Sequence, residues 1–266
     1  MADNAAFWYR EIARYLARRT GLRIEVVENV PWQERERMLD RGEVQLAFIC
    51  GLPYVRKVDR PPSRIELLAA PVMGSARYQR QPIYFSDVVV RRDSPFRSFA
   101  DLRGASWAYN EPGSQSGYNL IRSHLARLGE LSGYFGRVVE AGAHQTSLRM
   151  VLEGRVAASA IDSIVLELEL KRHPELAPEL RILETLGPSP IPPAVISTRV
   201  PAATRQRLRE ALLGMHADAE GRCVLTAGMA ARFVAMADGA YDAIRAMAIQ
   251  AEPVRLSPTR GRWMEP

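Results

Sequence analysis

The segment Ser114–Tyr118, with the sequence Ser-Gln-Ser-Gly-Tyr and called the serine loop below, carries side chains suited to binding a small anion. It follows a predicted strand and precedes a predicted helix, so free backbone N–H groups and the positive end of the helix dipole meet there. Ser114 and Ser116 add hydroxyl donors, and Gly117 lets a ligand approach the backbone closely. Such donors suit a phosphate-like group. Alternatively, Ser116 only caps the helix, and the loop alone leaves both interpretations open.

Four further side chains lie at predicted strand ends. His144 lies between a strand and a helix and could donate to an anion, although a lone loop histidine is often incidental. Asp162 ends a strand and either caps the next helix or accepts a hydrogen bond from a ligand. Tyr54 follows a strand and Tyr84 begins one, so each is either a packing residue or a ligand contact. Because ligands gather at strand ends in open α/β sheets, these positions and the serine loop together predict one binding site.

Strand and helix patterns alternate along the chain, which predicts an α/β protein whose first part has a parallel sheet covered by helices. The proline-dense segment 188–193 is interpreted as a crossover that returns the chain to its first lobe, and the tail after Glu252 as a loose end. The predicted lobes are residues 1–83 with 192–266, and residues 84–191. Helices are predicted at 6–19, 31–40, 117–128, 145–152, 204–215 and 223–237, and strands at 22–27, 44–49, 65–72, 84–90, 106–109, 137–140, 157–161 and 194–197.

The composition is that of an ordinary globular protein: of 266 residues, 47% are hydrophobic and 25% charged. No apolar run is long enough to cross a bilayer. The net charge is +6, but basic residues are scattered among acidic ones, which argues against nucleic-acid binding. Cys50 and Cys223 have no metal-ligand spacing, and whether they pair is left open; Cys50 is expected to be buried. No metal site, cofactor or catalytic residue is therefore predicted.

Several segments, taken in their order and spacing, resemble the phosphate/phosphite/phosphonate-type substrate-binding proteins of ABC transporters. The resemblance covers most of the chain. It implies a type II periplasmic-binding-protein fold, in which two α/β lobes joined by two crossovers, near Tyr84 and Pro192, close on a ligand. The segments are Gly42–Phe48, Gly51–Tyr54, Val88–Pro95, Ser98–Gly104, Ser114–Tyr118, Gly142–Ser147, Ala160–Ser163 and Pro190–Pro192.

The resemblance also implies a role for each polar position. The serine loop holds an oxyanion through Ser114, Ser116 and nearby amides, and His144 contacts the same group. The positions that line the cleft are Tyr54, Tyr84 and, on the far wall, Asp162.

Three departures from the family pattern stand out. Gln115 occupies a position where the family often has a hydroxyl residue, so one anion donor is in question and a bulkier ligand is expected. No first strand precedes the helix at Phe7, which leaves the first lobe a strand short with an exposed edge. No export signal is present either. A start placed too late would explain both absences, whereas a cytoplasmic relative would explain only the second.

The main functional hypothesis is a periplasmic solute-binding protein that takes up a phosphonate, phosphite or phosphate and delivers it to the permease of an ABC importer, without inserting into the membrane. The alternative is a cytoplasmic enzyme on the same fold, with His144 or Asp162 as a general acid or base acting on a small anionic metabolite. A sensory module is a third option, although no DNA-binding helix-turn-helix is evident before Phe7.

Overall fold

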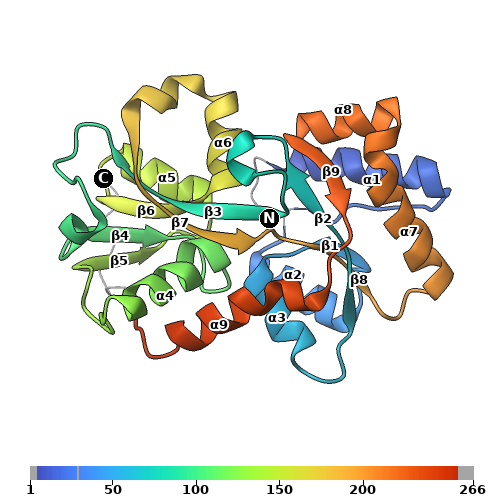
Figure 1. Cartoon of the computed structure of the whole chain (residues 1–266), viewed down its shortest axis with the longest axis horizontal. Helices are drawn as coiled ribbons and strands as arrows, with labels where there is room; N and C mark the ends of the chain where they lie inside the picture. The colour runs from blue at the N-terminus through green and yellow to red at the C-terminus, as the bar shows by residue number, and fades with distance from the viewer. Residues whose placement is uncertain (1–4, 29, 257–266) are drawn as a thin grey trace. The chain divides into compact units, whose positions relative to one another are not determined.

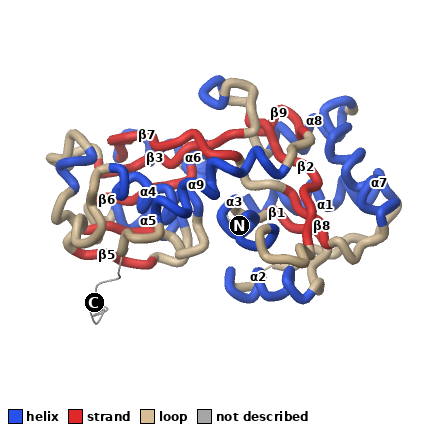
Figure 2. The backbone as a smooth tube through the Cα atoms, turned by 60° about the horizontal axis from the view of Figure 1, so that its bottom comes forward, coloured by secondary structure: helices blue, strands red, loops and turns tan. Residues whose placement is uncertain are grey.

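The computed structural model describes residues 5–28 and 30–256, and the chain divides into two compact units (Figure 1). Each unit contains a β-sheet with helices beside it, which confirms the predicted α/β class (Figure 2). None of the helices in the described residues is both long and apolar enough to span a membrane. The first unit comprises Met1–Tyr84 and Ser189–Arg245, and the second comprises Phe85–Pro188 and Ala246–Pro266.

The sheet of the first unit contains strands from both ends of the chain. Its elements are α1 (Ala6–Thr20), α2 (Trp32–Arg41), β1 (Leu46–Phe48), α3 (Gly51–Val58), β2 (Ile65–Met73), η2 (Ala76–Tyr78), β8 (Ala194–Ser197), α7 (Ala202–Gly214), η6 (Met215–Ala217), α8 (Ala219–Ala227), β9 (Ala230–Val234) and η7 (Asp238–Tyr241). The strand order is β1-β8-β2-β9, and each neighbouring pair is antiparallel. The predicted parallel pairing is therefore wrong here, because β8 returns from the second unit and inserts between β1 and β2.

Helix α1 supplies apolar side chains to the core of the first unit. Ile12, Tyr15 and Leu16 recur at helical spacing and are buried, as the sequence pattern predicts. Phe7, which the same pattern includes, is instead 46% exposed, and its neighbour Trp8 is buried. The ring of Trp8 stacks on that of Phe233 in β9, with centroids 6.2 Å apart. The helix ends at Gly21, whose left-handed φ of 65° suits a residue without a side chain.

The segment Leu22–Val27 forms no strand, so the prediction of a strand there is wrong. A strand is stable where a neighbouring strand pairs with its backbone, and this segment belongs to neither sheet of the described residues. Val26 and Val27 are 44% and 43% exposed, as expected for side chains without a covering layer. Alternating apolar residues thus indicate a strand only where a partner strand exists.

The predicted helix at 223–237 is confirmed only up to Ala227 and is wrong beyond it, because α8 ends there and β9 begins at Ala230. Gly228 packs so closely on Trp8 that an added Cβ would lie 2.2 Å from Trp8 Cε2. Met229 then adopts a left-handed φ of 57°. The chain turns at these two residues, and β9 pairs with β2 instead of extending the helix.

The second unit is an open sheet with helices packed against it. Its elements are β3 (Ile83–Arg91), η3 (Phe99–Leu102), β4 (Ser106–Tyr109), a π-helical turn η4 (Gln115–Asn119), α4 (Leu120–Arg127), β5 (Arg137–Glu140), α5 (His144–Leu152), β6 (Ala158–Asp162), α6 (Ser163–Arg172), η5 (Pro174–Glu179), β7 (Leu180–Pro190) and α9 (Asp242–Ala251). The strand order is β5-β4-β6-β3-β7. β4 pairs in parallel with β5 and β6, whereas β3 runs antiparallel to β6.

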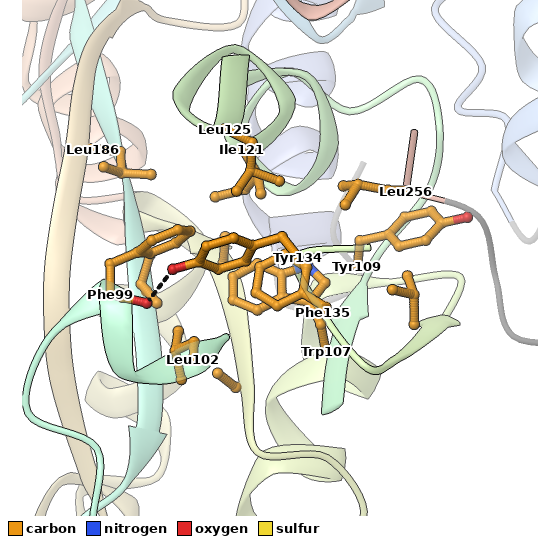
Figure 3. Packing of buried hydrophobic residues seen from close by; sticks show 14 of the residues in the cluster. Phe99, Leu102, Trp107, Tyr109, Ile121, Leu125, Tyr134, Phe135, Leu186 and Leu256 are labelled. Carbon is orange, nitrogen blue, oxygen red and sulfur yellow. Dashed lines mark hydrogen bonds between the residues drawn. The ribbon is translucent and has the colours of Figure 1, made fainter. Parts of the chain in front are cut away.

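An apolar core fills the space between this sheet and helix α4 (Figure 3). Alternate strand residues such as Trp107 and Tyr109 point into it, because successive side chains of a strand face opposite sides. Ile121 and Leu125 of α4 contact them from the helix. The ring of Trp107 stacks on Phe135 with centroids 4.4 Å apart. This packing fixes α4, and with it the serine loop that precedes the helix.

Three elements continue from one unit into the other: β3, β7 and α9. Helix α9 was not predicted, and residues after Arg245 group with the second unit, whereas the predicted first lobe extended to the C-terminus. Val254 and Leu256 are buried in the core of the second unit, and Arg122 Nε donates to the Val254 carbonyl at 3.0 Å. The predicted loose tail is therefore wrong up to Leu256, and residues 257–266 lie outside the described residues.

Candidate oxyanion-binding site

The serine loop forms the π-helical start of α4 in the second unit. Ser114 is the N-cap: its Oγ accepts a hydrogen bond from Gly117 N at 3.0 Å, and its carbonyl accepts from Asn119 N at 3.0 Å. The helical region therefore begins at Gln115 rather than at Gly117, and the cap is Ser114 rather than Ser116. π-helical turns inside α-helices occur frequently at functional sites. The oxygen of Ser114 is used as an acceptor, so its hydroxyl hydrogen is available to a ligand.

Ser116 and His144 meet inside the second unit. Ser116 Oγ lies 3.2 Å from His144 Nε2, within hydrogen-bonding distance, and both residues are more than nine-tenths buried. Ser86 in β3 donates from its Oγ to the Ser116 carbonyl at 2.9 Å. The structure thus brings two of the predicted ligand-binding residues into contact and fixes the backbone of one of them.

His144 is a neutral imidazole at physiological pH. Burial lowers the pKa of His144 to about 3, although the backbone oxygen of Ala160 acts in the opposite direction. Its Nδ1 is buried and makes no geometrically sound hydrogen bond to a described residue. A neutral imidazole offers one N–H donor and one acceptor, so His144 can donate to an oxyanion without contributing a positive charge.

Gly117 lies where two side chains leave no room for a third. An added Cβ would be 2.1 Å from Asn110 Oδ1 and 3.0 Å from His144 Cε1. Tyr118 next to it packs its ring on Tyr109, with centroids 4.9 Å apart, and the Arg122 guanidinium lies over the same ring. Glycine is therefore required at 117 by packing within the protein, and Tyr118 has a packing role beside its predicted ligand contact.

Gln115 points its side chain into the protein. Its Oε1 accepts from Asn119 Nδ2 at 2.8 Å, and its Nε2 faces Met247 Sδ of α9 at 3.1 Å. The residue is fully buried. These contacts anchor the π-helical turn to α9, and they engage the amide that the sequence analysis placed among the ligand donors. The expectation of a bulkier ligand drew on the identity of Gln115 alone and stays a prediction.

Asp162 caps helix α6, which was the simpler of its two interpretations. Its Oδ1 accepts from Ile164 N at 2.8 Å and from Val165 N at 3.3 Å. Burial nevertheless raises the pKa of Asp162 to about 7, despite these two backbone donors. Asp162 is paired across the sheet with Ser86, so the two side chains share a face. A ligand contact of Asp162 stays a prediction.

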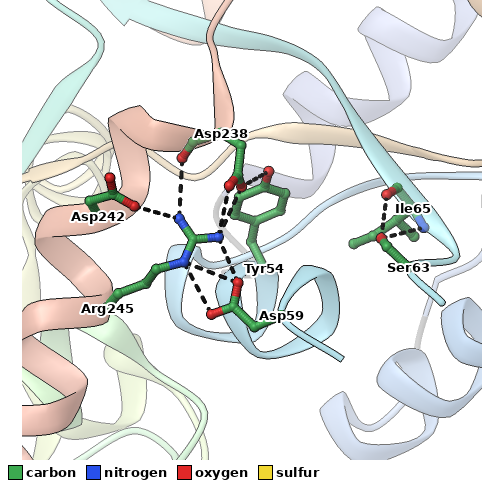
Figure 4. A network of polar contacts seen from close by, with 7 residues as sticks. All are labelled: Tyr54, Asp59, Ser63, Ile65, Asp238, Asp242 and Arg245. Atoms are coloured by element: carbon green, nitrogen blue, oxygen red, sulfur yellow. Dashed lines mark hydrogen bonds and ion pairs between the residues drawn. The ribbon is translucent and has the colours of Figure 1, made fainter. Parts of the chain in front are cut away.

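The two predicted tyrosines belong to the first unit. The hydroxyl of Tyr54 donates to Asp238 Oδ1 at 2.6 Å, and its ring lies 4.7 Å from that of Tyr241. Arg245 joins this network through ion pairs with Asp238 at 2.9 Å and Asp59 at 2.7 Å (Figure 4). Burial raises the pKa of Tyr54. Its hydroxyl therefore has a structural partner.

Tyr84 is fully buried at the start of β3. Like Tyr54, it stays a predicted cleft residue, and the packing role that the sequence analysis left open is consistent with its burial.

Cys50 and Cys223 form no disulfide, and Cys50 is half-buried rather than buried. No cluster of three or more His, Cys, Asp or Glu side chains that could hold a metal ion occurs within residues 5–28 and 30–256.

Two buried residues of the site were missed by the sequence analysis. Ser86 lies in the middle of an apolar strand, and Asn110 directly follows β4. Asn110 sits at a strand end, the position that drew attention to the other candidates, so its signal was present in the sequence. Ser86 had no such signal, because only the pairing of β3 with β6 places it beside Ser116.

Comparison with known families gives a match over nearly the whole chain. Residues 3–241 match the family described as "ABC transporter, phosphonate, periplasmic substrate-binding protein". The match includes the serine loop, His144 and Asp162.

Solved structures with the same fold include the binding protein component of an ABC phosphonate transporter from Pseudomonas aeruginosa. That structure has a TM-score of 0.83 at 19% identity, covering 95% of this chain and 83% of that one. PhnD1 from Prochlorococcus marinus, in complex with methylphosphonate, has a TM-score of 0.80 at 15% identity, covering 95% and 94%. The predicted type II periplasmic-binding-protein fold is therefore confirmed.

Proposed function

Because the chain belongs to the family of periplasmic substrate-binding proteins of phosphonate ABC transporters, we propose that it binds a small phosphorus oxyanion at the serine loop. A phosphonate, phosphite or phosphate is the proposed ligand, delivered to the permease of an ABC importer. The observation that carries the proposal is the contact of Ser116 Oγ with the neutral, buried His144 at the start of a helix.

The geometry supports this ligand class through its donors. When His144 Nε2–H donates to Ser116 Oγ, the Ser116 hydroxyl hydrogen is available to a ligand. This hydroxyl, the Ser114 hydroxyl and the N-terminus of the helical region all favour negative charge. Hydrogen bonds from such groups to an ionised oxygen are stronger than neutral ones. A tetrahedral oxyanion presents several oxygens and can use more than one of these donors at once.

Membership of a binding-protein family favours uptake over the alternative of a reaction on a small anionic metabolite. Binding requires donors that are held in place, and Ser114, Ser116 and His144 are all buried and fixed by hydrogen bonds or packing. The family is periplasmic, and we place the action of this protein in that compartment. Mass spectrometry of a ligand that co-purifies with the chain would identify which phosphorus oxyanion it binds.

Titration calorimetry with methylphosphonate, phosphite and phosphate tests the proposal, with sulfate as a comparison anion. The wild type is expected to bind at least one phosphorus oxyanion. The variant Ser116→Ala with His144→Ala should weaken that binding by at least about tenfold, or about 1.4 kcal/mol. Ser197→Ala serves as a matched control, because Ser197 is a buried serine of the first unit. No binding of any of the three anions, or equal affinity in the double variant, would refute the proposal.

A further inference from the structure

Asn110 connects the two loops that carry the candidate ligand donors. It directly follows β4, and its backbone carbonyl accepts a hydrogen bond from Gly142 N at 2.7 Å. Gly142 lies two residues before His144, so this bond fixes the start of the histidine-bearing loop. Through the next residues of the chain, Asn110 also leads into the serine loop.

The side chain of Asn110 lies against the serine loop itself. Its Oδ1 occupies the space beside Gly117, only 2.1 Å from the position that a Cβ on Gly117 would take. His144 Cε1 lies 3.0 Å from that same position. Asn110, Gly117 and His144 therefore form one packed contact, and removal of any side-chain volume from it would let the two loops approach or separate.

Asn110 is only 7% exposed, and its Oδ1 has no hydrogen-bond partner among the described residues. A buried acceptor without a partner is unfavourable for folding. An apolar side chain of similar size would avoid this cost, so stability alone does not account for an amide here. Unsatisfied buried polar groups are expected where a site, rather than the core, dictates the residue.

We propose that Asn110 is a positioning residue of the oxyanion site, which sets the separation between the serine loop and His144. The inference rests on the proposed function, since the two loops are taken to hold one ligand. In this arrangement, glycine at 117 is required because the Asn110 amide fills the space of its side chain. Ligand affinity should then depend on Asn110 even though no contact between Asn110 and the ligand is needed.

The first test compares Asn110→Ala with Ser159→Ala by calorimetry, using whichever of methylphosphonate, phosphite or phosphate the wild type binds. Ser159 is a matched control: it is a fully buried polar residue that donates to the Ala108 carbonyl of β4 at 2.9 Å. Asn110→Ala should raise the dissociation constant by about tenfold or more, with a thermal midpoint close to that of Ser159→Ala. An unchanged dissociation constant would overturn the inference. Should Asn110→Ala not fold, Asn110→Ser is measured instead with the same two outcomes.

The second test is a double-mutant cycle at positions 110 and 117, where an added Cβ would clash with Asn110 Oδ1. Gly117→Ala alone places its Cβ on Asn110 Oδ1 and should abolish binding or folding. Gly117→Ala combined with Asn110→Ala removes the clash with Asn110 and leaves the 3.0 Å approach to His144 Cε1, so it should recover folding and bind the anion more tightly than Gly117→Ala alone. Additive losses in the double variant would show that the two positions are independent, and the inference would fail.

A third measurement does not depend on the ligand. The Cε1–H resonance of His144, assigned by its loss in His144→Gln, should shift in Asn110→Ala and stay unchanged in Ser159→Ala. If the wild type binds no phosphorus oxyanion, the proposed function fails, but this resonance and the recovery of folding in the double variant still decide whether Asn110 sets the position of His144. An unshifted resonance contradicts the positioning role.

Discussion

At the scale of single residues, Asp162 combines two properties that usually oppose each other. As the N-cap of α6 it accepts two backbone hydrogen bonds, which favour the ionised form. Burial outweighs them and raises its pKa from 3.8 to about 7. The folded protein therefore binds a proton at Asp162 more tightly than the unfolded chain does.

This difference predicts a pH dependence of stability. A pKa that is raised in the folded state contributes stability that is complete below about pH 4 and is lost as the pH rises through about 7. Asp162→Asn keeps the capping oxygen but carries no titrating group. Relative to the wild type, its free energy of unfolding should therefore increase between about pH 5 and pH 8, by about 1 kcal/mol or more. Denaturant unfolding at several pH values measures this, and a difference that does not vary with pH would contradict it.

At the scale of elements, the turn between α8 and β9 shows how packing can end a helix. The sequence from Cys223 onward has a helical pattern, yet the chain leaves the helix at Gly228. The backbone of Gly228 lies directly against the Trp8 indole. The partner that imposes the turn comes from α1, far away in the sequence, so a local pattern could not reveal it.

We predict that Gly228→Ala destabilises the protein by about 1–3 kcal/mol, because its Cβ would lie 2.2–2.4 Å from three atoms of the Trp8 ring. Gly214→Ala is the matched control: nothing lies within 4 Å of its Cβ, and its φ of −83° suits any residue. That variant should be neutral or more stable by about 0.4–1 kcal/mol. Chemical denaturation of both proteins compares them. Equal effects of the two substitutions would show that contact with Trp8 does not determine the turn.

At the scale of the whole molecule, each unit has its own sheet and core, and three elements continue from one unit into the other. The serine loop, His144 and Asp162 all belong to the second unit, whereas Tyr54 and Tyr84 belong to the first. A ligand that binds only the folded protein stabilises it by mass action, whichever of these residues it contacts.

The bound oxyanion should therefore raise the thermal midpoint. At about 100 times its dissociation constant, a ligand adds about 2.7 kcal/mol to the free energy of unfolding. Thermal unfolding of the wild type with the anion identified by calorimetry should show this shift. The variant Ser116→Ala with His144→Ala, measured at the same anion concentration, should shift much less. Equal shifts in both proteins would indicate that the anion binds elsewhere.

The sequence by itself determined the α/β class, most helices and strands, and the placement of a serine loop between a strand and a helix. It could do so because helical and strand periodicity and glycine-terminated helices are local properties. The family resemblance rests on the same local segments. The prediction of a strand at Leu22–Val27 was wrong because strand pairing is not a local property. The prediction of a parallel sheet in the first unit was wrong because β8 arrives from a distant part of the chain and makes the sheet antiparallel.

Only the tertiary structure decided what surrounds the serine loop. It made Ser114 the cap, turned Gln115 toward α9, and placed His144 on Ser116. It also brought Ser86 against the Ser116 carbonyl and Asn110 against Gly117. Ser86 lies in an apolar strand that gives no sign of this contact, whereas Asn110 directly follows β4. The contacts of Gln115 with Met247, of Ser116 with His144 and of Ser86 with Ser116 join segments that are far apart in the chain, so a local pattern could not reveal them. The Ser114 cap is a local hydrogen bond from Gly117 N, but the sequence left open which serine makes it.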